Sequence, residues 1–246
     1  MVSLQALTED LDRLYEPEAF DDFCPNGLQV EGKGEVEKVA TGVTASLATI
    51  EKAVEWGADA LVVHHGLFWR GDRATLVGPM RAKVALLLEH GISLFGYHLP
   101  MDANPDVGNN FNAARDLGVK DLTPFAEFGV QGEIKPTPIA QWVEKAEAYY
   151  SHPAHTALGG PEEVKGVAII SGGAYKMLTE AADLGLDCMI TGNFDEPAWH
   201  IAQERGIHFL ALGHTNTEQV GPKALATYIE ERHRVATAFL EVPNPF

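Results

Sequence analysis

The sequence predicts an α/β protein made of duplicated α/β units with mainly parallel, mixed sheets. The first observation is a pattern that recurs four times: an amphipathic helix, a glycine that ends it and an apolar strand, with the glycines at positions 57, 91, 185 and 206. Glycine often ends helices in the left-handed conformation, and alternating helices and strands form parallel crossovers. The second observation is a longer repeat. Residues 39–102 and 167–218 share one order of strands, loops and helices, which two copies of one unit explain.

A helix precedes the first copy. Leu4, Leu7, Leu11 and Leu14 recur at three- and four-residue steps, so we expect an amphipathic helix that ends before Pro17. A turn at 24–27 and a short extended piece at 28–30 follow it. The apolar strands of the first copy are expected at 60–63 and 92–97.

A segment rich in proline and glycine, residues 123–138, separates the two copies. Because such segments often link domains, we place a boundary near Ala126, with a first domain over 1–126 and a second over 127–246. In the second copy a helix is expected at 139–150 and strands at 167–170, 188–191 and 207–212.

Composition narrows the classes of function. The chain has 246 residues and a formal charge of -17, so its surface repels phosphate backbones and anionic headgroups. We therefore expect no general nucleic-acid binding and no membrane binding, although a metal-lined pocket would still accept a small anionic substrate. Cys24 and Cys188 are far apart and form no C-x-x-C pair, which indicates neither a disulfide framework nor a thiolate metal site and fits a reducing cytoplasm.

Histidines and carboxylates follow three of the predicted strands. His64 and His65 end an apolar run and precede Gly66. Because side chains alternate along a strand, two adjacent imidazoles converge on one centre only where the strand ends and the chain turns, here with glycine. Taken alone, the pair is better explained as partly buried histidines bonded to the backbone.

The other two clusters share one spacing. His98 precedes Asp102, and His214 precedes Glu218, each by four residues and each directly after a strand. Pro100 and Pro105 predict a rigid loop that presents Asp102 from non-helical backbone. In the second cluster, Thr215 or Thr217 is expected to cap a helix with Glu218 in its first turn. Each motif alone is weak, but the three clusters together favour a ligand site at the carboxyl ends of the strands.

Nitrogen and oxygen ligands without sulfur suit Zn, Mn, Fe(II), Co or Ni, and the sequence does not choose among them. Five or six ligands exceed the number that one tetrahedral catalytic site uses. Two ions that share a bridging carboxylate would use them all, and a bridging water could then attack a phosphoryl, carbonyl or purine carbon. Hydrolysis is the natural reaction class.

Five motifs in this order resemble the GTP cyclohydrolase 1 type 2 homologue family, also called the Nif-three-like family. They are Pro-Asn-Gly-Leu-Gln-Val at 25–30, Val-Val-His-His-Gly at 62–66, Tyr-His-Leu-Pro-Met-Asp at 97–102, Thr-Gly at 191–192, and Gly-His at 213–214 with Thr-Glu at 217–218. The resemblance implies a duplicated α/β fold, a toroidal homohexamer and a dinuclear metal site. The implied ligands are His64, His65, Asp102, His214 and Glu218, with Glu218 bridging. His98 would then be either a nearby catalytic proton donor or a group that supports a ligand, rather than a ligand itself.

The chain departs from the family pattern at Asn193, where many relatives carry glutamate, and at Thr215 and Asn216. Two further stretches stay open to more than one interpretation. Ser171-Gly172-Gly173 is either a phosphate cradle or a plain tight turn, the turn being the more common meaning of a Gly pair. Phe68 and Trp69 either stack on a substrate ring or pack against a subunit neighbour.

Three functions follow from these observations. The first is a metal-dependent hydrolase of a small nucleotide- or pterin-like substrate. The second is a metal-binding oligomer without turnover, for storage, sensing or interaction. The third and weakest is GTP cyclohydrolase I chemistry, in which metal-bound water attacks C8 of guanine.

Overall fold

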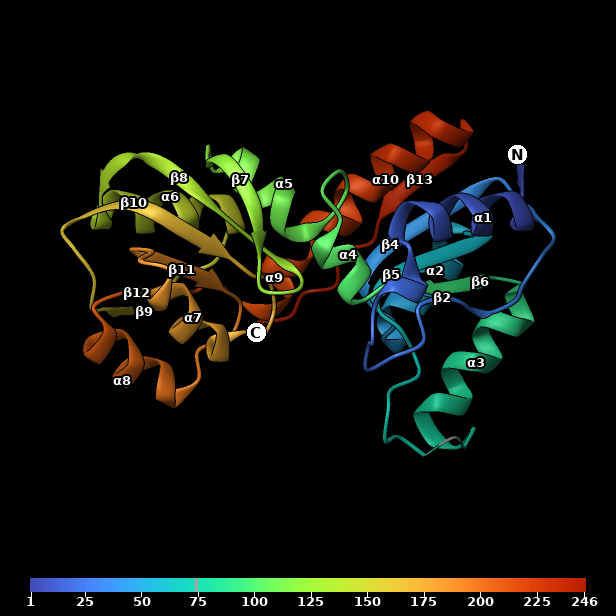
Figure 1. The fold of residues 1–246 in the computed structure, drawn as a ribbon. Helices are drawn as coiled ribbons and strands as arrows, with labels where there is room; N and C mark the ends of the chain where they lie inside the picture. Colours follow the sequence, from blue (N-terminus) through green and yellow to red (C-terminus); the bar gives the residue numbers. More distant parts are fainter. Residues whose placement is uncertain (74) are drawn as a thin grey trace. The chain divides into compact units, whose positions relative to one another are not determined.

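The computed structural model describes residues 1–73 and 75–246, and its contacts divide the chain into two compact units (Figure 1). The first unit comprises Met1–Met101 and Gly221–Pro243, and the second comprises Asp102–Val220 and Asn244–Phe246. Ala126, near which the sequence places a domain boundary, lies in the second unit between two paired strands. No helix in the described part of the chain combines the length and apolar character needed to cross a membrane.

The first unit contains a five-stranded sheet with the order β13-β4-β5-β6-β2, in which only β2 is antiparallel to its neighbour. Its strands are β2 (Gly27–Val30), β4 (Lys38–Thr44), β5 (Ala60–His65), β6 (Ser93–Gly96) and β13 (Ala236–Phe239), and β1 (Val2–Ser3) pairs with β3 (Glu35–Val36) in a separate ribbon. Its helices are α1 (Leu4–Tyr15), α2 (Leu47–Trp56), α3 (Gly78–His90) and most of α10 (Val220–His233), with a short 3-10 turn at Pro17–Ala19.

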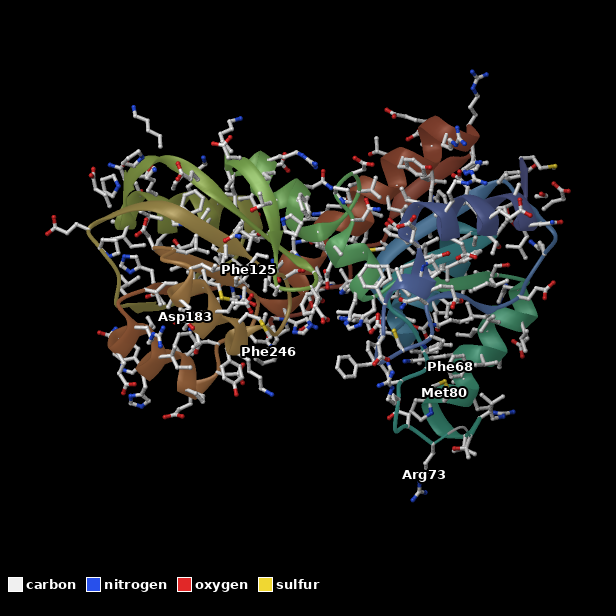
Figure 2. All side chains as sticks on the ribbon, in the orientation of Figure 1. Phe68, Arg73, Met80, Phe125, Asp183 and Phe246 are labelled. Atoms are coloured by element: carbon white, nitrogen blue, oxygen red, sulfur yellow. The ribbon has the colours of Figure 1, made fainter. Side chains whose placement is uncertain are left out.

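Both faces of this sheet are covered, as expected for parallel strands whose sequences are unbroken runs of apolar residues. Leu61, Val63 and Leu94 form one core cluster with Ile50 of α2 and Leu87 of α3, and Phe68 and Met80 pack against it (Figure 2). Val62 and Phe95, which alternate with these residues along the strands, are also fully buried.

Asp10 fixes α10 to α1. Its buried carboxylate accepts a hydrogen bond from the Tyr228 hydroxyl at 3.1 Å and lies 2.9 Å from Nε2 of His233 and 3.4 Å from Nε of Arg232. A buried carboxylate with several hydrogen-bonded partners contributes to stability because each partner offsets its loss of water. The cluster therefore ties the two ends of the first unit's sequence together.

The second unit contains a six-stranded sheet with the order β7-β8-β10-β11-β12-β9. β10, β11 and β12 are parallel, and the other three strands join antiparallel. The strands are β7 (Lys120–Phe125), β8 (Gly129–Pro138), β9 (His155–Leu158), β10 (Glu163–Ile169), β11 (Cys188–Thr191) and β12 (His208–Ala211). The helices are α5 (Asn109–Asp116), α6 (Ile139–Tyr150), α7 (Leu178–Asp183), α8 (Glu196–Arg205) and α9 (His214–Glu218), with a 3-10 turn at Tyr175–Met177.

Helices cover both faces of this sheet as well. Trp142 and Tyr150 of α6 pack with Ala113 and Leu117 in one core cluster, and Leu178 of α7 packs with Ala198 and Ala202 of α8 in another. The expected link over 123–138 is wrong, because these residues form the antiparallel β7–β8 hairpin. Pro124 is tolerated in β7 because β7 is an edge strand, where a missing N–H on the outer side costs no hydrogen bond of the sheet. The later prolines of β8 lie beyond Gly129–Glu133, the part of β8 that pairs with β7.

Each unit thus contains three parallel strands in sequence order, β4-β5-β6 and β10-β11-β12. This arrangement confirms the predicted α/β class with mixed sheets. The carboxyl ends of such strands are where ligands bind in open α/β sheets. His64 and His65 end β5 and His98 follows β6, while Ser171, Asn193 and His214 follow β10, β11 and β12.

Candidate metal centre

Three histidines of the first unit form one group. His64 is fully buried, His65 and His98 are partly buried, and a ring nitrogen of each lies within 4.8 Å of one from the other two. The ring centroids are 4.6 Å apart for His64 and His65 and 5.0 Å apart for His64 and His98. Gly66 makes room here, because a Cβ at this position would overlap the side chain of Gln29, whose Oε1 accepts from the Leu67 N–H.

Each of these rings is oriented through Nδ1. Nδ1 of His64 lies 3.2 Å from the Tyr97 carbonyl oxygen, which can only accept, so Nδ1 carries the proton. Nδ1 of His65 lies 3.0 Å from the Thr44 hydroxyl, and Nδ1 of His98 lies 2.7 Å from Oδ1 of Asp22. An oxygen that can only accept, as beside His64 and His98, places the proton on Nδ1, and an oxygen partner on Nδ1 directs the other nitrogen to a metal. Nε2 is therefore the nitrogen that would bind an ion.

Asp22 is a site residue that the sequence analysis did not identify. Its Oδ2 accepts hydrogen bonds from the Asn26 amide at 3.0 Å and the Leu99 N–H at 2.9 Å, in addition to the His98 contact. Burial alone would raise the pKa of Asp22, but the hydrogen bonds from His98 and Asn26 lower it to about 2. The carboxylate stays ionised and holds the His98 ring. Asp22 lies 76 residues before His98, and no spacing in the sequence connects them.

Cys24 lies in the same region, since its sulfur, a carboxylate oxygen of Asp22 and a nitrogen of His98 are all within 4.8 Å of one another. Burial, and then the Asp22 carboxylate, raises the pKa of the Cys24 thiol to about 12. The thiol is therefore neutral at pH 7 when no ion is bound.

In the second unit, His214 and Glu218 occupy the first and last positions of α9. Nε2 of His214 lies 3.0 Å from Oε1 of Glu218, and Nδ1 of His214 lies 3.2 Å from the amide oxygen of Asn193. Glu218 is only 2% exposed. The expected cap by Thr215 or Thr217 is wrong: Gly213 is the N-cap, and the threonine at 217 bonds the carbonyls of Gly213 and His214 instead.

The loop after β10 is shaped to this pair. Gly172 has a φ of +67°, and a Cβ there would overlap the Glu218 carboxylate and lie 3.3 Å from Nε2 of His214. Its N–H donates to Thr217, and the Ser171 and Ala174 N–H groups donate to side chains as well. Because these three amides already have partners, the structure favours a tight turn over a phosphate cradle. It positions the ligand candidates.

Asp102 is 3% exposed and lies on α4 (Leu99–Ala103), so the expectation of a non-helical loop is wrong. Pro100 is the second residue of this helix, where its missing N–H costs no hydrogen bond. Oδ1 of Asp102 accepts hydrogen bonds from the Ser171 hydroxyl at 2.7 Å and the Asn109 amide at 2.8 Å. Ser171 and Gly172 therefore join Asp102 to the His214 and Glu218 pair within the second unit.

These donors fit a divalent transition ion. They are imidazoles with Nδ1 beside an oxygen atom and buried carboxylates, which is the donor chemistry that Zn, Mn, Fe, Co and Ni share. The structure brings together His64, His65 and His98 in one unit, and His214, Glu218 and, through the Ser171 loop, Asp102 in the other. Trp69 packs against the first group, with its ring 5.1 Å from that of His98.

Comparison with known proteins gives a consistent result. The family model for Duf34/NIF3 (NGG1p interacting factor 3) matches residues 2–245 of this chain. A relative from Chlamydia pneumoniae named "GTP cyclohydrolase 1 type 2 homolog" is 46% identical over 246 residues, which are 98% of each chain. Among solved structures, one described as protein ybgI of unknown function matches with a TM-score of 0.96 and 38% identity, covering 100% of both chains. A protein from Thermus thermophilus matches with a TM-score of 0.93 and 34% identity over 100% of both chains.

Proposed function

The chain belongs to the Duf34/NIF3 family, the family that its motifs resemble, and we propose that it is a metal-dependent hydrolase of a small nucleotide- or pterin-like substrate. In this proposal two divalent ions bind to His64, His65, Asp102, His214 and Glu218, with Glu218 bridging. The relative from Chlamydia pneumoniae carries cyclohydrolase in its name, which is consistent with a purine or pterin substrate.

One observation carries the proposal. The three proposed ligand histidines all have Nδ1 beside an oxygen atom, at 3.2 Å for His64, 3.0 Å for His65 and 3.2 Å for His214. Such partners are the usual support of metal-binding imidazoles, because they fix the tautomer and the ring plane. A chance set of surface histidines would not share this arrangement.

When bound, a pair of divalent ions supplies a water that ionises near neutral pH and can attack a phosphoryl or purine carbon centre. The chain's own residues supply the rest. The ionised Asp22 holds His98 by Nδ1, so that His98 can pass a proton from Nε2 to the leaving group. Ser171 and Asn109 fix the Asp102 carboxylate, and Trp69 packs against the rings of His65 and His98.

The charge of the chain supports a small anionic substrate. At -17, the exterior repels anions, so a cation-loaded site would be the attractive place for a phosphate or a similar group. The two buried free cysteines suit the reducing cytoplasm, where we propose the protein acts.

We further propose that the chain forms the homohexamer that its motifs imply. Leu76, Val77 and Leu88 of the first unit are more than half exposed, which is consistent with apolar surface that a neighbouring copy covers. Light scattering coupled to size-exclusion chromatography tests this proposal. A mass six times that of the chain is expected, and a monomer at micromolar concentration would contradict it.

The central experiment is metal analysis of protein purified without chelator, followed by a screen of nucleotides and phosphoesters with Mn, Zn, Fe and Co. We expect close to two ions per chain and metal-dependent turnover of at least one substrate. His64→Ala should lose both the metal and the turnover, whereas His90→Ala, an exposed histidine at the end of α3, should keep both. Full metal content with no turnover of any substrate would count against a hydrolase.

That last outcome would favour a second candidate, a metal-binding oligomer that stores, senses or delivers metal. The observation in its favour is Asn193, which places a neutral amide beside His214 where a glutamate would offer a second carboxylate. This candidate predicts labile metal whose occupancy changes partner binding. The third candidate, GTP cyclohydrolase I chemistry, is tested by incubation with GTP and a search for a fluorescent pterin product.

A further inference from the structure

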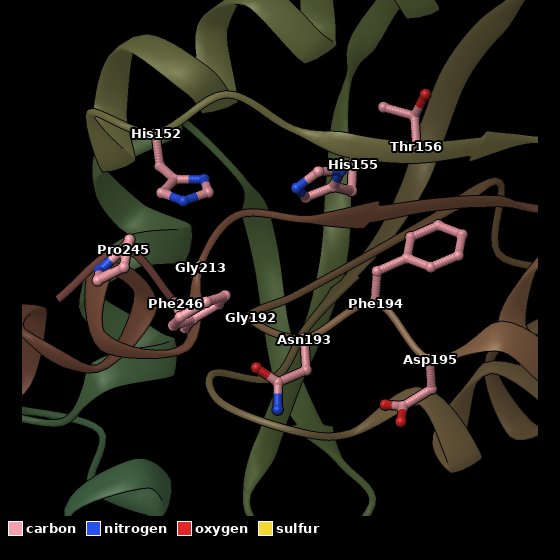
Figure 3. Close-up of a pocket in the computed structure, with 10 residues that line it drawn as sticks. All are labelled: His152, His155, Thr156, Gly192, Asn193, Phe194, Asp195, Gly213, Pro245 and Phe246. Atoms are coloured by element: carbon pink, nitrogen blue, oxygen red, sulfur yellow. The ribbon is translucent and has the colours of Figure 1, made fainter.

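A cavity of about 630 Å³ opens at the carboxyl ends of β11 and β12 in the second unit (Figure 3). This volume lies in the range of sites that enclose small organic ligands, roughly 300–1,000 Å³. Its walls include His152, His155, Asn193, Phe194, Asp195 and Phe246. None of these residues is among the proposed metal ligands.

The cavity adjoins one of those ligands. Asn193 forms part of its wall, and the same side chain places its amide oxygen 3.2 Å from Nδ1 of His214. Gly192 and Gly213 also line it. A Cβ on Gly192 would come within 2.7 Å of the His214 Cα, and a Cβ on Gly213 within 2.9 Å of the His152 ring. A molecule held in this cavity therefore sits next to the backbone that carries His214.

Ring-shaped side chains surround the space, as Figure 3 shows for His152, His155, Phe194 and Phe246. Phe194 is held in place by an edge contact with Phe209, with ring centroids 5.6 Å apart. The carbonyl of Phe246 accepts a hydrogen bond from the Thr215 N–H at 3.0 Å. Aromatic side chains around a cavity of this size suit a flat ring, because every heteroaromatic base offers a face for stacking.

Asp195 gives the cavity a preference among flat rings. It occupies the N-cap position of α8, yet its side chain makes no capping hydrogen bond, and no described residue donates a hydrogen bond to its carboxylate. An ionised carboxylate can only accept, so it pairs with a ring edge that presents neighbouring N–H donors. A guanine-type edge, with a ring N–H beside an amino group, meets this requirement. An adenine edge places a ring acceptor there and does not.

We infer that this cavity, the ring cavity, binds the planar nitrogen heterocycle of the substrate, with Phe194 as a stacking surface and Asp195 as the acceptor for a ring edge with two adjacent donors. The inference rests on the proposed function only in taking this ring to be part of the substrate. The chemistry that follows from it is recognition of a 2-amino-4-oxo ring, as in guanine-type and pterin-type molecules.

The test uses whole, chelator-treated protein and two neutral probes, guanosine and adenosine, so that neither metal nor phosphate contributes to binding. Affinity is measured by titration calorimetry, with ligand-observed NMR for weak binding. We expect guanosine to bind about tenfold or more tightly than adenosine, in line with a paired hydrogen-bond contact. Asp195→Asn should remove that preference, and Phe194→Ala should weaken both probes by about tenfold or more.

The matched control is Trp199→Ala, which removes an exposed aromatic of α8 that does not line the ring cavity and should leave both affinities unchanged. Asp195→Asn alters no apolar packing, so it still tests the inference if Phe194→Ala fails to fold. Binding of neither probe, equal binding of both, or a guanosine preference that survives Asp195→Asn would overturn the inference. Zinc binding by the same variants, measured by equilibrium dialysis, separates the two proposals: lost nucleoside binding with zinc retained concerns the ring cavity alone.

Discussion

Replacing Gly172 by alanine tests whether the loop after β10 is shaped around the carboxylate of Glu218. The variant meets two costs. The first is backbone strain, since a φ of +67° disfavours any L side chain by roughly 1–2 kcal/mol. The second is specific to the site, because the new Cβ would overlap the Glu218 carboxylate and lie 3.3 Å from Nε2 of His214. The carboxylate must therefore move.

Gly185→Ala separates these costs. Gly185 lies in the same unit and has a φ of +73°, but a Cβ there would meet nothing within 4 Å. In chelator-treated protein, Gly185→Ala should lower the melting temperature by roughly 2–8 °C through strain alone, and Gly172→Ala should lower it further because the Glu218 carboxylate must also move. Only Gly172→Ala should weaken metal binding, by about 10–100-fold, the usual loss when the support of a ligand is disturbed.

The assay is titration calorimetry with zinc and manganese on chelator-treated protein, alongside thermal unfolding of the same samples. Two folded variants with the same metal affinity would refute the reasoning, because the Glu218 carboxylate would then tolerate displacement. A loss of metal in Gly185→Ala as well would also refute it, since that effect would come from general destabilisation rather than from contact with the ligand.

Three further predictions concern side chains around the site and the first unit. Asp22→Asn removes a carboxylate whose pKa of about 2 lies below its ordinary 3.8. The native carboxylate stabilises the fold by about 2 kcal/mol above pH 4, and this contribution is lost as the pH falls towards 2. In acid unfolding experiments, the free energy of unfolding of the variant should therefore depend less on pH between about 4 and 2 than that of the native protein. Asp10→Asn should cost about 1–3 kcal/mol in denaturant unfolding by weakening the tie to His233, with metal content unchanged. Ser171→Ala should weaken metal binding by about tenfold or more because Asp102 loses the hydrogen bond from the Ser171 hydroxyl, and unchanged affinity by calorimetry would contradict that role.

The parallel strands at the centre of each unit could be predicted because buried parallel strands consist of short runs of apolar residues. The run 60–63 is part of β5, and 188–191 is β11 itself, each after a helix that is followed within two residues by a glycine. The position of His64 and His65 at a strand end followed from the same pattern. Local composition is enough for this level of structure because each strand is buried on both faces.

The errors arose where a residue's effect depends on its place in an element. Proline suggested a link at 123–138 and a loop at 100–105, yet Pro124 lies on an edge strand and Pro100 in the first turn of a helix, and both places tolerate a missing N–H. The division of the chain into two units between Met101 and Asp102 likewise depends on contacts between residues far apart in the sequence, which a local sequence pattern does not contain.

Asp22 shows what distance in sequence conceals. It lies in an ordinary acidic and aromatic stretch, and only the packing of that stretch against the end of β6 brings its carboxylate to His98. The Nδ1 partners of the proposed ligand histidines could not be predicted either, since a backbone carbonyl such as that of Tyr97 leaves no mark in the sequence. The chain sequence proposes the ligands, whereas the groups that orient them required coordinates.

The parallel pairing of β13 with β4 has a consequence for synthesis of the protein. Residues 236–239 pair with residues 38–41, so the first unit acquires its edge strand only after the intervening residues 42–235 have been translated. The second unit is almost continuous in sequence and is complete earlier, apart from its last three residues. During translation, β4 of the first unit therefore has an unpaired edge until β13 is made. An unpaired strand edge exposes a ribosome-bound chain to aberrant strand pairing and increases its need for chaperones.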